Sequence, residues 1–182
     1  MTPSDHPLDA ALREADLIHD GAALDAAITR IAAQLDQALA GTRAVLLTVM
    51  QGGLPFAGQL ATRIRAPLLL DYVHATRYRG ETSGGELHWL HRPRIALQGQ
   101  TVLLVDDILD EGHTLDELRR WCIGQGAARV LIVVLCEKRH GRGVGLKADF
   151  VGVEVPDRYV FGYGMDYHEQ GRNLPAIYAL RT

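Results

Sequence analysis

Four acidic residues follow a short aliphatic run in the stretch VLLVDDILDEGHTL, residues 102–115. Two of them, Asp106 and Asp107, are adjacent, and like charges at contact distance raise each other's pKa unless a cation or a polyol shares the charge. Mg²⁺ prefers oxygen ligands and is usually held by one or two carboxylates together with substrate phosphates. The pair therefore indicates a site for a metal ion or a diol.

The residues that come next are suited to an anion. Gly112 lets backbone amides approach a ligand closely, and a helical pattern begins near Thr114. The amino end of a helix attracts negative charge, because its first N–H groups are unpaired and its dipole is favourable there. Acids for a metal or diol, followed at once by amides for a phosphate, predict a site for a phosphorylated sugar.

The elements that must position this site read as strands alternating with helices. Short aliphatic runs at 44–50, 66–73, 102–105 and 129–136 predict buried strands, and helical patterns occupy 24–39, 51–64 and 115–127. This alternation predicts an α/β fold with a doubly wound, mainly parallel sheet flanked by helices. Ligands of such sheets bind beyond the carboxyl ends of the strands, which is where the acids stand.

Residues 74–94 break this pattern. They carry turn formers and scattered charges without sustained periodicity, and structureless stretches of such length in compact domains are usually functional lids or linkers. We expect a mobile active-site loop at 74–94 within a single domain that spans residues 1–182. His88 and His91 have a spacing compatible with a metal, but no other ligand is near them in sequence, so we expect exposed histidines instead.

The chain has 182 residues, a mass of 20.0 kDa and a formal net charge of -3. This size suits one domain with one core, and the charge gives no reason to expect binding to nucleic acid or to an anionic membrane.

Cys122 and Cys136 lie in apolar segments without the spacing of a disulfide framework or a zinc site, so both are expected to be reduced core thiols. No leader pattern and no run of about 18 apolar residues is visible, so we expect a cytoplasmic protein.

The stretch at 102–115 resembles the phosphoribosyl-pyrophosphate binding motif of the type I phosphoribosyltransferases: an aliphatic strand, two acids, two aliphatics, Asp, a small residue, Gly, any residue and Thr. The tail at 137–180 is similar to the hypoxanthine-guanine branch, with a lysine, DFVG, PD, GYG, DY and RNLP in this order. The resemblance implies the type I fold with a small hood, and an enzyme of purine salvage. Such an enzyme converts hypoxanthine, and guanine as well, with phosphoribosyl pyrophosphate to IMP or GMP and pyrophosphate, and it requires Mg²⁺.

The resemblance also implies roles in the acidic stretch. Asp106 and Asp107 hold the ribose hydroxyls, partly through Mg²⁺, and Asp110 lies beside the purine N7 as the catalytic general base, although a helix cap is the plain alternative for it. Position 111 is commonly a small or hydroxyl residue in the family, so we expect the Glu111 side chain to turn to solvent or to pair with a cation such as Arg139. The implied donor-binding residues are Asp106, Asp107, Asp110, Glu111, Gly112, His113 and Thr114.

For pyrophosphate, the resemblance points to the segment VMQGG, where family members often carry a cis peptide, here between Met50 and Gln51. Many relatives have a basic residue in place of Gln51, and most have Ser in place of Arg77. A plain turn at Gly52 and Gly53 is the alternative for this segment. The implied pyrophosphate-binding residues are Gln51, Gly52, Tyr78 and Arg172.

For the purine, the resemblance implies that Lys138 donates to O6 and approaches N7, which selects 6-oxopurines over adenine. Tyr159 would stack on the base, Val160 would present backbone groups to its edge, and Asp166 would help to hold Mg²⁺ with pyrophosphate. A solvated lysine and a core aromatic are the ordinary alternatives for Lys138 and Tyr159. The implied purine-binding residues are thus Lys138, Tyr159, Val160 and Asp166, and the implied metal ligands are Asp106, Asp107 and Asp166.

Two other functions stay open at this point. A xanthine-preferring transferase differs only in how backbone groups near Val160 and Asp166 read position 2 of the purine. A non-catalytic regulator that binds nucleic acid on the same fold would use basic residues such as Arg92 and Arg94, but no aromatic stacking platform accompanies them. The expected partners are a purine base and phosphoribosyl pyrophosphate, no nucleic acid and no membrane, with the chain in a homodimer or homotetramer.

Overall fold

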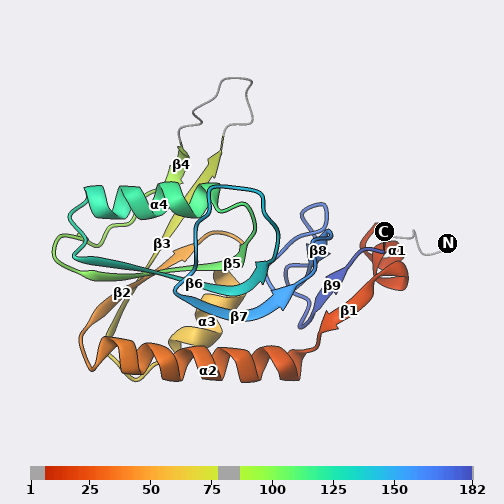
Figure 1. The fold of residues 1–182 in the computed structure, drawn as a ribbon, viewed down its shortest axis with the longest axis horizontal. Coiled ribbons are helices and arrows are strands. Elements are labelled where there is room, and N and C mark those ends of the chain that lie inside the picture. The colour runs from red at the N-terminus through yellow and green to blue at the C-terminus, as the bar shows by residue number, and fades with distance from the viewer. Residues whose placement is uncertain (1–6, 78–86, 182) are drawn as a thin grey trace, which may run out of the picture.

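The computed structural model describes residues 7–77 and 87–181, which form two sheets (Figure 1). The larger sheet has six strands in the order β4-β3-β2-β5-β6-β7. β4 pairs antiparallel with β3, and the other neighbours are parallel. The strands are β2 (Ala44–Val49), β3 (Leu68–Arg77), β4 (Leu87–His91), β5 (Thr101–Leu109), β6 (Arg129–Lys138) and β7 (Phe150–Val155).

Helices cover both faces of this sheet. α2 (Gly21–Leu39) and α3 (Leu54–Ala61) lie on one face and α4 (His113–Gly124) lies on the other (Figure 1). Because successive strand residues point to opposite faces, Leu103 of β5 packs in the core with α2, while Leu104 packs in the core with α4. Strands that are buried on both faces need continuous aliphatic runs, which is the pattern in the sequence. The predicted doubly wound, mainly parallel α/β fold is therefore confirmed.

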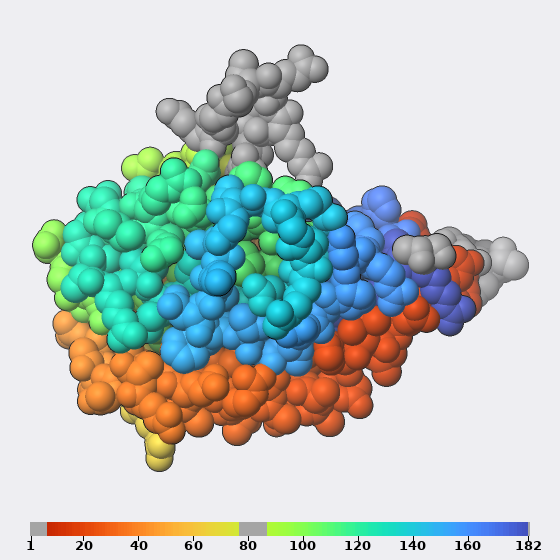
Figure 2. Space-filling view, viewed as in Figure 1, coloured from red at the N-terminus to blue at the C-terminus, as the bar shows by residue number. Residues whose placement is uncertain are grey.

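A smaller antiparallel sheet forms a hood at one end of the molecule, with strand order β1-β9-β8. It consists of β1 (Asp16–His19), β8 (Val160–Phe161) and β9 (Ile177–Ala179), and α1 (Pro7–Glu14) precedes it. The Asp16 carboxylate accepts hydrogen bonds from Arg158 at 2.8 Å and from Arg181 at 3.0 Å. The hood thus joins both ends of the described chain, and red and dark blue atoms meet there in Figure 2.

The helix expected at 24–39 is present, and its ends have clear causes. Asp20 caps its amino end, because the side chain accepts a hydrogen bond from the Ala23 backbone N–H at 2.8 Å. At the other end the chain turns left-handed at Ala40, with φ 48°, and again at Gly41, with φ 79°. Ala40 and Gly41 together therefore form the turn that ends the helix. The leucines and isoleucines that recur along one face of this helix are buried in the core.

β5 is longer than the sequence predicted. The aliphatic run suggested a strand that stops at Val105, but pairing with β6 continues to Leu109 opposite Glu137. Asp106 and Asp107 therefore lie within the strand, near its carboxyl end, rather than beyond it. Backbone pairing with a neighbouring strand depends little on side-chain polarity, so the charged side chains did not end the ladder as the local pattern had indicated.

The prediction of an irregular segment at 74–94 is wrong for residues 74–77 and 87–91, whereas residues 92–94 belong to no helix or strand. Residues 74–77 belong to β3 and residues 87–91 to β4, and the two strands pair antiparallel, with Thr76 opposite His88. Trp89 of β4 packs against Trp121 of α4, with ring centroids 4.9 Å apart, so a contact that is distant in sequence supports the strand. The alternation in β4 is hidden in the sequence by its two histidines. Tyr78 lies outside the described residues.

Both cysteines are free and buried, as expected from their apolar surroundings. Burial raises the pKa of the Cys122 thiol to about 12 and raises that of Cys136 as well. Thiolates are therefore disfavoured at both positions. In the part of the chain that the structure describes, no helix is both long and apolar enough to cross a membrane.

Candidate active site

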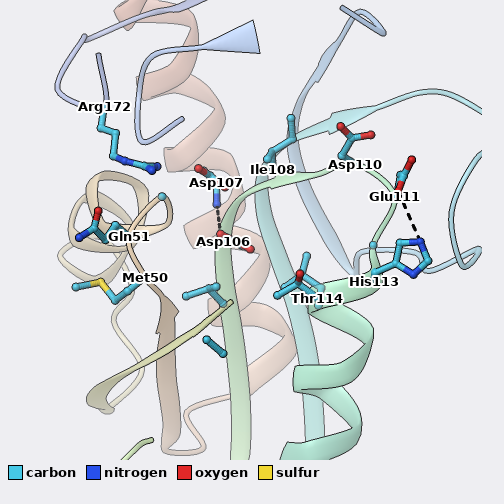
Figure 3. A pocket seen from close by; sticks show the side chains of 15 residues that line it. Met50, Gln51, Asp106, Asp107, Ile108, Asp110, Glu111, His113, Thr114 and Arg172 are labelled. Atoms are coloured by element: carbon cyan, nitrogen blue, oxygen red, sulfur yellow. Dashed lines mark hydrogen bonds and ion pairs between the residues drawn. The ribbon is translucent and has the colours of Figure 1, made fainter. Parts of the chain in front are cut away.

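A pocket of about 510 Å³ opens at the carboxyl ends of β2 and β5 (Figure 3). Its walls come from the turn after β2, from the end of β5 with the start of α4, and from the hood. Parallel strands bring their carboxyl ends to one edge of the sheet, which gathers residues that are distant in sequence. The predicted site residues that line it are Gln51, Gly52, Asp106, Asp107, Asp110, Glu111, Gly112, His113, Thr114 and Arg172.

The acid pair lines this pocket, with Asp107 buried and Asp106 half-buried. Asp107 is only 8% exposed, and its backbone N–H donates to Oδ1 of Asp106 at 2.9 Å. Burial raises the pKa of both carboxyls, and repulsion from Asp107 raises the pKa of Asp106 further. Two adjacent buried carboxyls in this state are stabilised by a cation or by hydroxyl donors.

The donor set at this pair fits Mg²⁺, which prefers carboxylate oxygens and takes its remaining ligands from substrate and water. No group of three His, Cys, Asp or Glu side chains among the described residues is arranged to hold a metal ion. Asp166, the third predicted ligand, instead pairs with Arg172 at 2.8 Å. The chain itself therefore offers Asp106 and Asp107, and substrate oxygens would have to complete the coordination.

The turn after β2 packs directly against β5. Its Met50–Gln51 peptide bond is cis, as the resemblance implied. A Cβ added to Gly52 would lie 1.9 Å from Oδ2 of Asp107, and one added to Gly53 would lie 2.8 Å from the Val105 carbonyl oxygen. Only glycine permits this close approach, so the two residues do more than form a plain turn.

The amino end of α4 forms another wall. Gly112 precedes the helix with φ 80°, a conformation that suits glycine, and the first N–H groups of a helix have no partner within it. The Glu111 side chain is 52% exposed, and its Oε2 lies 3.6 Å from Nε2 of His113 (Figure 3). The expected turn toward solvent agrees with this geometry. The suggested partner is wrong, because Arg139 instead pairs with Glu154.

Asp110 is held by two side chains from the end of β6. Lys138 Nζ lies 2.7 Å from Oδ2, and His140 Nε2 lies 2.6 Å from Oδ1. Burial raises the pKa of Asp110, but the hydrogen bonds from Lys138 and His140 outweigh burial, so that its pKa is lowered overall. Asp110 is not the cap of α4, since Gly112 occupies that position. The sequence analysis missed His140 as a site residue. The one feature that could have indicated it is its position two residues after Lys138.

The hood supplies the remaining predicted residues. Arg172 lines the pocket, donates to the Gly164 carbonyl oxygen at 2.8 Å and pairs with Asp166. The Tyr159 hydroxyl donates to the Asp166 carbonyl oxygen at 3.0 Å, and its ring is half exposed. Val160 is buried in β8. The pocket lining does not include Lys138, Tyr159, Val160 or Asp166. Asp110 connects Lys138 to it, and Arg172 connects Asp166.

His88 and His91 are not brought together with other metal ligands among the described residues. His91 stacks on Tyr72 with ring centroids 4.0 Å apart, and His88 is exposed. An exposed histidine was expected at both positions. It is found at His88 only, because the stacking partly buries His91.

In comparisons with known proteins, the family model and the similar proteins all point to phosphoribosyltransferases. The family model of the phosphoribosyl transferase domain matches residues 14–170. A hypoxanthine-guanine phosphoribosyltransferase of Bacillus subtilis is 36% identical over 155 residues, which covers 85% of this chain and 86% of that protein. One from Streptococcus pneumoniae is 35% identical over 156 residues, which covers 85% of this chain and 87% of that protein.

Solved structures agree with this comparison. The crystal structure of a hypoxanthine-guanine phosphoribosyltransferase from Bacillus anthracis has a TM-score of 0.86 at 29% identity, over 91% of this chain and 98% of that one. That of a hypoxanthine phosphoribosyltransferase from Staphylococcus aureus has a TM-score of 0.88 at 26% identity, over 100% of this chain and 97% of that one.

Proposed function

Since this chain belongs to the phosphoribosyl transferase domain family, we propose that it is a purine salvage enzyme. It transfers the phosphoribosyl group of phosphoribosyl pyrophosphate to hypoxanthine or guanine, and it releases IMP or GMP together with pyrophosphate. One observation carries the proposal: a single pocket is lined by the acid pair, by Asp110 and by the amino end of α4. These are the groups that a phosphorylated sugar with a reacting anomeric carbon requires.

The donor occupies this pocket in an orientation that its walls define. The 5′-phosphate lies at the amino end of α4, where residues 111–114 offer backbone N–H groups and the Thr114 hydroxyl. The ribose hydroxyls lie over Asp106 and Asp107. The pyrophosphate lies between the turn that contains Gln51 and Gly52 and the guanidinium of Arg172, a forked cation suited to phosphate oxygens. Tyr78 is assigned to the same group by the resemblance alone.

Asp106 and Asp107 would also hold Mg²⁺ together with donor oxygens, and Asp166 remains a proposed third ligand. When bound, the metal would neutralise charge on the leaving pyrophosphate. Asp166 would have to exchange its ion pair with Arg172 for this role, since the two side chains now bind each other. Both partners of that ion pair would then face the pyrophosphate.

The base lies beyond Asp110, between Lys138 and the hood. Lys138 donates to O6, Tyr159 stacks on the ring, and Val160 presents its backbone to the base edge. During transfer the bond from the anomeric carbon to pyrophosphate breaks, a ring nitrogen forms the new bond, and Asp110 accepts the proton that the base loses at N7. Carboxylates near the anomeric carbon stabilise the positive charge that develops on the sugar. The lowered pKa of Asp110 keeps it ionised for this task.

The enzyme is also proposed to act as a homodimer or homotetramer. Large apolar side chains are exposed on β3, β4 and the start of α3, namely Leu54, Leu70, Tyr72 and Leu90. A second copy of the chain would cover them, as apolar surface in homo-oligomers usually is covered. Sedimentation of the wild type against Leu70→Glu tests this, and a monomeric wild type would contradict it.

A cytoplasmic location is part of the proposal, because the charged donor and product do not cross bilayers unaided.

Steady-state assays with hypoxanthine, guanine, xanthine and adenine, each with and without Mg²⁺, test the function. The proposal expects turnover of hypoxanthine or guanine that depends on Mg²⁺, and little turnover of adenine. A preference for xanthine would leave the chemistry intact and change the substrate. No turnover of any base, together with tight binding to RNA or DNA, would contradict the enzyme and favour a regulator.

A further inference from the structure

Both oxygens of the Asp110 carboxylate are occupied by side chains, one from Lys138, the last residue of β6, and one from His140, two residues later. The contact with His140 is the shorter, at 2.6 Å, against 2.7 Å for Lys138. The His140 side chain is 6% exposed, whereas that of Asp110 is 40% exposed. Asp110 lines the ligand pocket and His140 does not, so His140 contacts Asp110 from outside the lining.

The hydrogen bonds of His140 indicate which of its ring nitrogens is the donor. The backbone N–H of Arg142 donates to Nδ1 of His140 at 3.1 Å. A ring nitrogen that accepts a hydrogen bond must carry a lone pair, so the proton of the neutral imidazole is on Nε2. Nε2 is then the donor in the bond to Oδ1 of Asp110.

The segment that carries His140 is itself fixed at several points. The Arg142 guanidinium donates to both carboxylate oxygens of Asp157, at 2.7 and 2.5 Å. The Val144 backbone N–H donates to the Glu111 carbonyl oxygen at 3.0 Å, and a Cβ on Gly143 would lie 2.1 Å from that oxygen. The segment thus packs directly on the loop that contains Asp110, so it can hold a side chain of that loop in one orientation.

Lys138 cannot hold Asp110 in this way by itself. Its ammonium is a point charge on a flexible stem, and in the proposed function it must also donate to the purine O6. The hydrogen bond from Lys138 to Oδ2 of Asp110 therefore changes when the base binds. The imidazole has a single N–H, a single acceptor for it and no role at the ligand.

We propose that His140 is a positioning residue for Asp110: as a neutral imidazole it donates from Nε2 to Oδ1 and orients the carboxylate so that Oδ2 faces the purine N7. This inference rests on the proposed function, in which Asp110 accepts a proton from the base. A general base must be aligned with the proton that it takes, and its own partner commonly provides the alignment. The arrangement makes catalysis sensitive to a residue that touches no substrate.

A pH profile separates this role from a merely structural one. The groups that face Asp110 are Lys138 and His140, with the ion pair of Arg142 and Asp157 behind them, Glu111 beside it and the buried thiol of Cys136. The hydrogen bond from His140 lowers the pKa of Asp110. Its removal should raise that pKa, so the acid limb of kcat/KM should move to higher pH.

The test compares His140→Ala, His140→Gln and the control Arg139→Ala. Gln places an N–H near the position of Nε2 but does not ionise, and Arg139 is an exposed neighbour whose side chain pairs with Glu154. For His140→Ala we expect kcat to fall roughly 10- to 100-fold, as for a misaligned catalytic group, with the acid limb shifted to higher pH. His140→Gln should restore most of the wild-type kcat and most of the wild-type position of the acid limb. Arg139→Ala should resemble the wild type in both.

Carbon-13 NMR titration of the Asp110 carboxyl gives a readout that needs no turnover. A higher Asp110 pKa in His140→Ala than in His140→Gln and the wild type would support the inference, whatever the substrate proves to be. Equal pKa values in all the variants would overturn it, and so would an active His140→Ala with an unshifted acid limb. A wild type that is inactive with every purine, but shows the NMR shift, would overturn the proposed function alone. Melting curves of both variants exclude unfolding as the cause.

Discussion

A methyl group on Gly52 should disable the enzyme by displacing Asp107. The added Cβ of Gly52→Ala would lie 1.9 Å from Oδ2, 2.6 Å from Cγ and 3.0 Å from Oδ1 of Asp107. To restore a contact of at least 3.0 Å, the two closest atoms must separate by about 1.1 Å. A shift of about 1 Å in a group that positions substrate costs roughly 100-fold in rate, or about 2.7 kcal/mol of transition-state stabilisation.

The assay is steady-state kinetics with varied phosphoribosyl pyrophosphate at saturating Mg²⁺ and purine. We expect kcat/KM for the donor to fall roughly 100-fold in Gly52→Ala, since Asp107 is proposed to hold the ribose and the metal. Gly124→Ala is the matched control. Its Cβ would meet nothing within 4 Å at the end of α4, so activity should be unchanged and stability equal or slightly higher.

A double-mutant cycle isolates the contact. In an Asp107→Ala background the oxygens and Cγ that the new methyl meets are absent, so adding Gly52→Ala should cause little further loss. If Gly52→Ala retains donor kinetics within about threefold of the wild type, the position of Asp107 does not limit the reaction. If the two losses multiply instead, the methyl acts through something other than Asp107. Either result would refute the reasoning.

Three further predictions concern the acidic groups. Asp110→Asn should lower kcat roughly 10²- to 10⁴-fold, the range for a lost general base, while its melting temperature shows that the fold is intact. Glu111→Thr should change the KM for the donor less than about threefold, because the side chain points to solvent and pairs with His113; many-fold tighter donor binding would contradict this. The folded-state pKa of Asp106 is raised, so its contribution to stability is present at low pH and is lost as the pH rises through that pKa. Asp106→Asn should therefore raise the melting temperature at neutral pH without Mg²⁺ by on the order of 2–4 °C, while it impairs turnover.

Much of the fold followed from local pattern, because strands buried on both faces must be continuously aliphatic. The runs in β2, β5 and β6 were found in this way, and so was the apolar face of α2. Local pattern failed where a distant partner decides the structure. β5 extends through Asp106 and Asp107 because β6 continues beside it, and β4 forms because it pairs with β3 and packs Trp89 on α4.

The same division applies to the site. Residue type and spacing alone determined the pocket chemistry at 106–114, since acids, a glycine and a helix start follow one another in the chain and need no distant contact to act together. Only the tertiary structure decided that Asp110 is held by Lys138 and His140, that Arg172 pairs with Asp166, and that Gly52 packs on Asp107. The sequence separation of these contacts runs from 6 positions, for Arg172 and Asp166, to 55 positions, for Gly52 and Asp107. Such contacts depend on how the strands and loops pack.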